Sequence, residues 1–228
     1  MNDSVENRCI YCGKTFKKAQ TLFVHVCEKK RRANAKNEKH VVIAFDAFNR
    51  FYKINHAATQ DKTYDDFMQS PFYNAFVKFG SFVNNVNPLY PHNFIDYVVK
   101  SGVKLDHWCR DDLYDNYVVN LIRTENVETA LERSINHMID WGKTTGMEWD
   151  QYFVSVSLNR FVYDIKDGKI SPWLVLQTSS GKNMLKQMSD EQLEKITVVI
   201  DPSFWMIKFK RQPSDVELVK MVVNESKL

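Results

Sequence analysis

The chain has 228 residues, of which 44% are hydrophobic and 26% charged, a balance that excludes extensive disorder. Its seven glycines and six prolines are few, which favours helices over a sandwich or barrel that would need many tight turns. No secretory leader opens the chain and no apolar run approaches a membrane-spanning length, so we predict a cytoplasmic protein without membrane contact.

Positive charge is concentrated near the amino terminus. Residues 1–40 carry ten Lys and Arg against four Asp and Glu, a net charge of +6. The remaining residues carry 21 against 24, a net charge of −3. A cationic segment on an otherwise acidic chain is the charge pattern expected of a region that binds phosphates.

One segment, CIYCGKTFKKAQTLFVHVCEKKRR at residues 9–32, combines metal-binding residue types with a defined spacing. Two residues separate Cys9 from Cys12, twelve separate Cys12 from His25, and one separates His25 from Cys27. Thiolate and imidazole groups are preferred zinc ligands, and four of them close a tetrahedral site. The sequence therefore predicts Zn²⁺ as the cofactor, bound by these four residues.

The pattern Cys-x2-Cys-x3-Phe-x5-Leu-x2-His over residues 9–25 resembles the C2H2 zinc-finger family. The resemblance implies a ββα unit, in which a hairpin carries the two thiols and a helix from about Lys18 carries His25. Phe16 and Leu22 would form its small core. Because such a core cannot offset the ordering of the whole segment, we expect the finger to be unfolded without metal.

The fourth ligand departs from the family pattern. Family members end in two ligands roughly three to five residues apart on one helical face, whereas His25 and Cys27 would point to nearly opposite sides of a regular helix. The helix must therefore end or distort between them. Glu28 and His40 are alternative fourth ligands, and Cys27 is preferred because a thiolate binds zinc more strongly.

The resemblance also implies a nucleic-acid interface, with DNA favoured over RNA. Outward-facing residues of the finger helix would meet base edges, and flanking cations would contact phosphates. A single finger covers about three base pairs, which gives little specificity alone. The predicted contacts are Lys14, Lys17, Lys18, Gln20, Thr21, Lys29, Lys30, Arg31 and Arg32. The alternative is an adaptor whose finger binds protein, because isolated fingers also do this and a KKRR run can simply be solvated.

The whole chain loosely resembles the uncharacterised zinc-finger proteins of tailed bacteriophages. These share a short finger that ends in His-x-Cys before a basic run, followed by a helical body. The resemblance implies the cytoplasm of an infected bacterium as the setting, and it carries no known activity.

Beyond the finger, apolar residues recur at helical spacing, so we predict a mainly α chain with an all-helical body. The expected division is a finger with its basic tail at 1–32, a linker at 33–40 and a helical domain at 41–228. Capping patterns at Thr63–Asp66, Ser189–Gln192 and Ser214–Glu217 predict three helix starts. The expected helices cover 41–57, 72–83, 91–101, 105–123 and 125–142, with two short helices meeting near Ser157 and another opening at Ser171.

Nothing in the body positively predicts an enzyme. The segment Ser180–Asn183 lacks both the first glycine and the magnesium-binding hydroxyl of a phosphate loop. Asp111, Asp112 and Asp115 fit the acidic first turn of a helix better than a divalent-ion site. The tryptophans lie in apolar runs, which predicts a core rather than surfaces for stacking bases. We expect the helical body to bind a protein partner instead.

Overall fold

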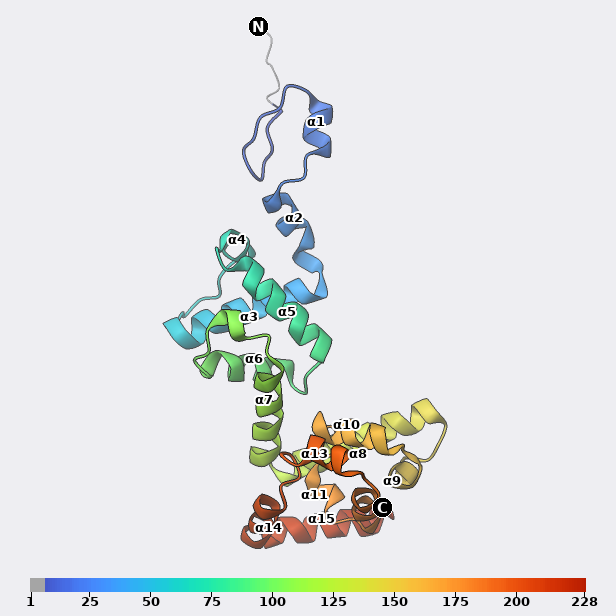
Figure 1. The fold of residues 1–228 in the computed structure, drawn as a ribbon. Helices are drawn as coiled ribbons and strands as arrows, with labels where there is room; N and C mark the ends of the chain where they lie inside the picture. The colour runs from blue at the N-terminus through green and yellow to red at the C-terminus, as the bar shows by residue number, and fades with distance from the viewer. Residues whose placement is uncertain (1–6) are drawn as a thin grey trace. The chain divides into compact units, whose positions relative to one another are not determined.

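The structure is a computed structural model that describes residues 7–228 (Figure 1). These residues form helices, and the chain divides into two compact units, Met1–Arg110 and Asp111–Leu228. In the described part of the chain, no helix is both long and apolar enough to cross a bilayer. The expected helical body is confirmed, whereas its division into a linker at 33–40 and one domain at 41–228 stays a prediction.

The predicted ββα finger is wrong, because residues 7–228 contain no strand. What takes the place of the hairpin is one isolated antiparallel bridge between Arg8 and Thr15. Inside it, the backbone N–H of Gly13 donates to the carbonyl of Cys9 over 2.8 Å, and the N–H of Cys9 donates to Lys14 over 2.9 Å. The Cys9 bond and the bond from the Phe16 N–H to the Asn7 carbonyl, over 2.8 Å, form the bridge, and the Gly13 bond closes the turn within it.

The finger helix is also shorter than expected. Helix α1 spans Ala19–Val24, and His25 follows it in extended backbone with φ −67° and ψ 121°. Helix α2 (Glu28–Asn34) begins immediately after Cys27, which is its N-cap. The chain therefore does leave helical conformation before Cys27, as expected, but the helix already ends at Val24 and does not carry His25.

The amino-terminal unit packs its long helices around a cluster of aromatic rings. Helix α3 packs on α5 and α6, and the rings of Phe48, Phe67, Phe76 and Trp108 are almost completely buried. The helical spacing of the aromatics therefore marked a core, as predicted. Besides α1 and α2, the unit contains η1 (Ala35–Asn37), α3 (Lys39–His56), α4 (Tyr64–Gln69), α5 (Tyr73–Val86), α6 (Pro91–Lys100) and η2 (Leu105–His107).

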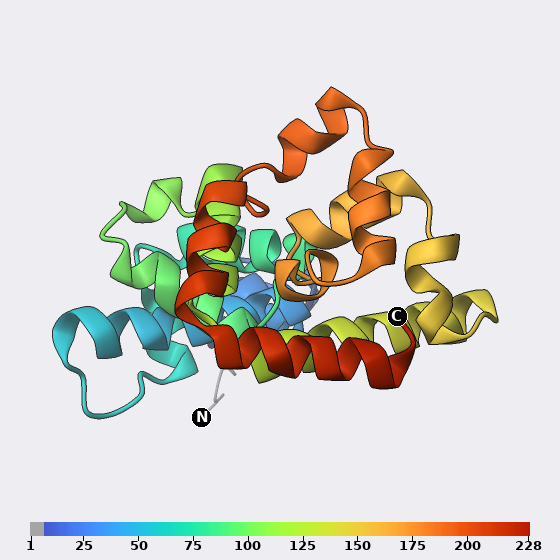
Figure 2. The same cartoon turned by 90° about the horizontal axis from the view of Figure 1, so that it is seen from below.

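The carboxy-terminal unit is built around a short buried helix, α11 (Pro172–Val175), which packs on α8, α12 and α15. All four residues of α11 are buried, and the N–H of Ser171 donates to Ser134 Oγ of α8 over 2.9 Å. Helix α15 lies beside α8 (Figure 2). The helices are α7 (Asp111–Thr124), α8 (Val127–Thr145), η3 (Trp149–Gln151), α9 (Tyr152–Ser155), α10 (Leu158–Lys166), α11, α12 (Ser179–Lys186), α13 (Asp190–Ile196), α14 (Pro202–Arg211) and α15 (Pro213–Ser226).

The capping predictions have mixed outcomes. Both reciprocal hydrogen bonds of a capping box are present at Thr63–Asp66 and at Ser189–Gln192. The box expected at Ser214–Glu217 is wrong, because α15 already begins at Pro213 and Gln212 is its N-cap. The helix expected over 105–123 is interrupted, with η2 ending at His107 and α7 starting at Asp111, next to the division between the units.

Gly80 sets the approach of α5 to α3, and its replacement by alanine tests this packing. A Cβ atom at Gly80 would lie 2.1 Å from the His40 carbonyl oxygen and 2.8 Å from the Ala44 nitrogen. We expect Gly80→Ala to lower the free energy of unfolding by about 3 kcal/mol, as for severe overpacking. The intrinsic helix preference for alanine, about 1 kcal/mol, acts in the opposite direction.

The measurement is urea unfolding of the full chain, followed by circular dichroism. Ser81→Ala is the matched control, because Ser81 is the next residue of α5 and is only half-buried. Its effect should stay within about 0.5 kcal/mol. Equal stability of Gly80→Ala and the parent chain would contradict the close helix crossing.

Candidate metal centre

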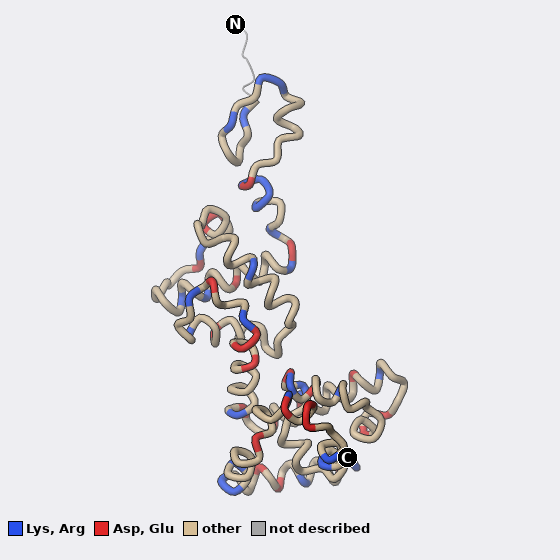
Figure 3. The backbone as a smooth tube through the Cα atoms, viewed as in Figure 1, with Lys and Arg blue, Asp and Glu red and all other residues tan. Residues whose placement is uncertain are grey.

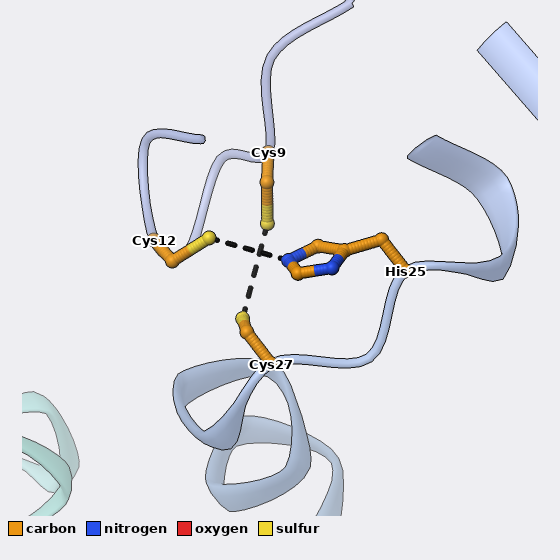
Figure 4. A group of neighbouring side chains, drawn as sticks. All are labelled: Cys9, Cys12, His25 and Cys27. Atoms are coloured by element: carbon orange, nitrogen blue, oxygen red, sulfur yellow. Dashed lines mark hydrogen bonds between the residues drawn. The ribbon is translucent and has the colours of Figure 1, made fainter. Parts of the chain in front are cut away.

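The four predicted ligands come together at one point (Figure 4). Cys9 and Cys12 come from the turn that precedes α1, His25 follows α1, and Cys27 precedes α2. Their ligand atoms all lie within 4.8 Å of one another. The described residues therefore contain a Cys3His cluster that can hold a metal ion.

Two of the distances between ligand atoms are close to the edges of a tetrahedral zinc site. Cys9 Sγ and Cys27 Sγ are 3.9 Å apart, and Cys12 Sγ lies 3.3 Å from His25 Nε2. Metal–ligand bonds of zinc length give tetrahedral edges of about 3.8 Å between two sulfurs and about 3.6 Å between sulfur and nitrogen. In Figure 4 the line that joins Cys9 to Cys27 crosses the line that joins Cys12 to His25. The diagonal between two sulfurs in a square plane would be longer, about 4.6 Å.

Backbone N–H groups contact the thiols, and around Cys9 they favour the ionised, metal-binding form. The pKa of Cys9 lies below its ordinary value, and the hydrogen bond from the backbone N–H of Cys12 contributes most to this lowering. Cys27 Sγ accepts a hydrogen bond from the backbone N–H of Lys30 over 3.4 Å.

The turn between the first two thiols needs a residue that tolerates left-handed backbone. Gly13 has φ +73°, a left-handed conformation that glycine adopts without steric cost. Arg8, which the sequence reasoning did not single out, donates from Nε to the Gly13 carbonyl over 3.0 Å. The side chain of Arg8 therefore fixes the outside of the same turn.

The apolar core of the finger is small, as predicted. The rings of Phe16 and His25 lie 4.7 Å apart, and Phe16 and Leu22 are both only half-buried. Of residues 7–27, Cys9 alone is fully buried. Structural zinc supplies about 10–16 kcal/mol in small fingers, far more than two half-buried side chains can contribute.

The two alternative fourth ligands lie outside the cluster. Glu28 pairs with Arg32 one turn along α2, and His40 Nε2 lies 3.5 Å from a carboxylate oxygen of Glu38. Cys27 therefore lies with the other three ligands in the structure, whereas Glu28 and His40 contact other side chains.

The predicted nucleic-acid contacts are spread over the finger and α2, where basic segments follow each other along the chain (Figure 3). Most are exposed, and Lys30 is half-buried with Nζ 3.3 Å from the His25 carbonyl. Among the described residues, none of the finger lysines nor Arg31 forms an ion pair with a carboxylate. The exposed members are Lys14, Lys17, Lys18, Gln20, Thr21, Lys29 and Arg31.

Arg32 differs from the other predicted contacts because its guanidinium is engaged within the amino-terminal unit. It stacks 4.4 Å from the ring centre of Tyr73 and donates to the Met68 carbonyl over 2.8 Å. The hydroxyl of Tyr64 donates to the backbone carbonyl of Arg32 over 2.6 Å. With 18% of its side chain exposed, Arg32 holds α2 against α4 and α5.

The capping role of Cys27 had no signal in the sequence, because serine, threonine, aspartate and asparagine are the usual N-cap residues. The docking of Arg32 was equally hidden inside a run of four cations. The prediction that Ser180–Asn183 is not a phosphate loop agrees with the structure, where this segment lies in α12. The N–H of Gly181 donates a hydrogen bond to the Thr178 hydroxyl oxygen.

Comparison of the chain with protein-family models, with curated proteins and with solved structures gives no match. The zinc-finger assignment therefore depends on the cluster and its spacing, and the loose resemblance to tailed-bacteriophage proteins has no support from a relative.

We expect the chain to bind one tetrahedrally coordinated ion, and Cys27→Ser to weaken that binding by at least about 100-fold, because a thiolate ligand is lost while serine can still cap α2. Cobalt(II) titration followed by absorption spectroscopy measures this, since tetrahedral thiolate ligands give intense visible bands. Cys109→Ser is the matched control, because Cys109 lies outside the cluster and should leave the titration unchanged. Equal binding by both variants would contradict a four-ligand site.

Proposed function

We propose that the chain is a zinc-dependent nucleic-acid-binding accessory protein, with a finger that contacts DNA or RNA and a helical body that docks a protein. The carrying observation is that Cys27 belongs to the metal cluster and also caps the basic helix α2. A bound ion would hold the finger and the first turn of α2 in one fixed arrangement.

Zinc is the proposed ion because the donor set is three thiols and one imidazole. Such soft and borderline ligands in a tetrahedron are typical of zinc, whereas magnesium and calcium require oxygen ligands. All four positions are filled by protein side chains, which fits a structural rather than a catalytic ion.

A polyanion is the proposed partner of the finger because its lysines and Arg31 form no ion pair with a carboxylate of the described residues. The amino-terminal unit carries 17 Lys and Arg against 10 Asp and Glu, a net charge of +7. The carboxy-terminal unit has a net charge of −4, from 14 against 18. Nucleic acid is attracted to the first and repelled by the second, with DNA proposed ahead of RNA on the finger resemblance.

The proposed setting is the cytoplasm, and specifically that of an infected bacterium if the resemblance to phage finger proteins holds. In such a setting the body would dock host or viral machinery for transcription, replication or packaging.

Replacement of two exposed cations tests the interface. We expect Lys29→Gln combined with Arg31→Gln to flatten the slope of log K against log salt by up to about 1.8, because each lost phosphate contact removes about 0.9. The measurement is fluorescence anisotropy with labelled duplex and single-stranded DNA across a salt series.

The control variant, Lys182→Gln with Lys186→Gln, removes the same charge from exposed positions of α12. Its salt slope should equal that of the parent chain. No measurable binding of the parent chain at low salt would exclude the nucleic-acid function.

The second candidate, a protein adaptor, is favoured by a specific observation. The finger exposes Ile10, Phe23, Val24 and Val26, and the side chain of Phe23 is 84% exposed. Isolated surface apolars are common, but so many on one small module suit a protein interface. For an adaptor, these side chains rather than the lysines would provide the contact.

Phe23→Ser distinguishes the two candidates. In the adaptor function, affinity purification from the native cell should lose the partner with Phe23→Ser and retain it with Lys29→Gln plus Arg31→Gln. In the nucleic-acid function, the DNA affinity of Phe23→Ser should match that of the parent chain, since the substitution changes no charge.

A further inference from the structure

A cavity of about 730 Å³ in the carboxy-terminal unit is lined by three basic side chains, those of Arg123, Lys208 and Arg211. Its volume lies within the usual range of small-molecule sites, roughly 300–1,000 Å³. The unit as a whole has a net charge of −4, yet these three cations lie close together. The remaining lining residues are Thr124, Glu125, Asn126, Phe204, Ile207 and Gln212.

Arg123 keeps a hydrogen-bond donor unused. Its Nη2 donates to the Val198 carbonyl over 3.1 Å, and its guanidinium lies 4.6 Å from the ring centre of Phe204. The carboxylate of Asp201 lies 3.6 Å from the same nitrogen. Nε of Arg123 is buried and has no acceptor among the described residues. The guanidinium is therefore fixed in place with one buried N–H unsatisfied.

Lys208 is a half-buried ammonium with one protein acceptor. Its Nζ donates to the Arg123 carbonyl over 2.8 Å and lies 5.4 Å from the ring centre of Trp205. Burial lowers the pKa of Lys208, against the opposite effect of Glu125 and Asp215. No carboxylate of the described residues lies within ion-pair distance of Nζ. Because an ammonium has three donors, two remain for a ligand.

The one carboxylate in the lining is already neutralised. Glu125 is almost completely buried and forms a two-pronged ion pair with Arg133. Arg211 is exposed, and no hydrogen bond or ion pair joins it to another residue of the described chain. The cavity therefore presents three positive groups, of which Arg123 is paired with Asp201, while Lys208 and Arg211 have no carboxylate of the described residues within ion-pair distance.

The three cations also lie in the last turns of α7 and α14, where basic residues interact favourably with the helix dipole. This accounts for the position of each cation along its helix. It does not account for their convergence on one cavity, nor for the donors of Arg123 and Lys208 that have no acceptor there.

We propose that this cavity binds a nucleotide unit, with the phosphate oxygens between Arg123, Lys208 and Arg211. A phosphate group supplies several charged acceptors, and arginine side chains match their geometry. The flat base would lie against the apolar wall of Phe204 and Ile207, and the side chain of Ile207 is 48% exposed. The proposal concerns a different part of the chain from the finger and does not depend on the function proposed for it.

Isothermal titration of the metal-loaded full chain with AMP and with inorganic phosphate tests the proposal. We expect one AMP per chain, bound more tightly than phosphate alone, and an affinity about tenfold weaker in Arg211→Gln. Lys210→Gln is the matched control, because Lys210 is the neighbouring exposed cation of α14 and does not line the cavity. Its affinity should stay within about twofold of the parent chain.

A second probe identifies the source of the nucleotide, and a second variant separates this site from the finger. If a 5′-phosphorylated oligonucleotide binds while AMP does not, and the affinity falls in Arg211→Gln alone, the nucleotide belongs to a strand. AMP binding should survive Lys29→Gln plus Arg31→Gln whether or not the finger contacts nucleic acid. Absence of binding by both probes, or an equal loss in Arg211→Gln and Lys210→Gln, would overturn the proposal.

Discussion

The amino-terminal end of the structure depends on one sulfur atom, Cys27 Sγ, which takes part in two structures at once. It lies 3.9 Å from Cys9 Sγ in the metal cluster and accepts the Lys30 backbone N–H at the start of α2. The two demands are compatible because the chain leaves helical conformation at His25. If the finger continued as one helix, Cys27 could neither join the metal cluster nor cap a new helix, because its thiol would face away from the imidazole of His25.

Spacing predicted the ligands well because coordination geometry restricts which side chains can meet. The four residues at 9, 12, 25 and 27 were selected from the sequence, and their ligand atoms converge in the structure. The helical body and its aromatic core followed from periodicity for a similar reason. Burial of Phe48, Phe76 and Trp108 leaves a regular apolar repeat along each helix.

The errors arose where backbone hydrogen bonds or tertiary contacts decide the outcome. The family resemblance implied two strands, but the turn around Cys9 and Cys12 closes on itself and leaves a single bridge. Ser214 matched a capping pattern, yet Pro213 is already suited to the first helical position and Gln212 takes the cap. Arg32 differs from its basic neighbours in the residues that surround it, which no local pattern describes.

The contacts of Arg32 also change the interpretation of the segment expected to be the basic tail of the finger. A flexible basic tail would lose conformational entropy when it met a polyanion, and that loss would oppose binding. Here Tyr64, Met68 and Tyr73 already hold α2 through Arg32. The neighbouring cations are thus part of an ordered helix. In the proposed complex with nucleic acid, less conformational entropy would be lost on binding, so each electrostatic contact would contribute more to the affinity.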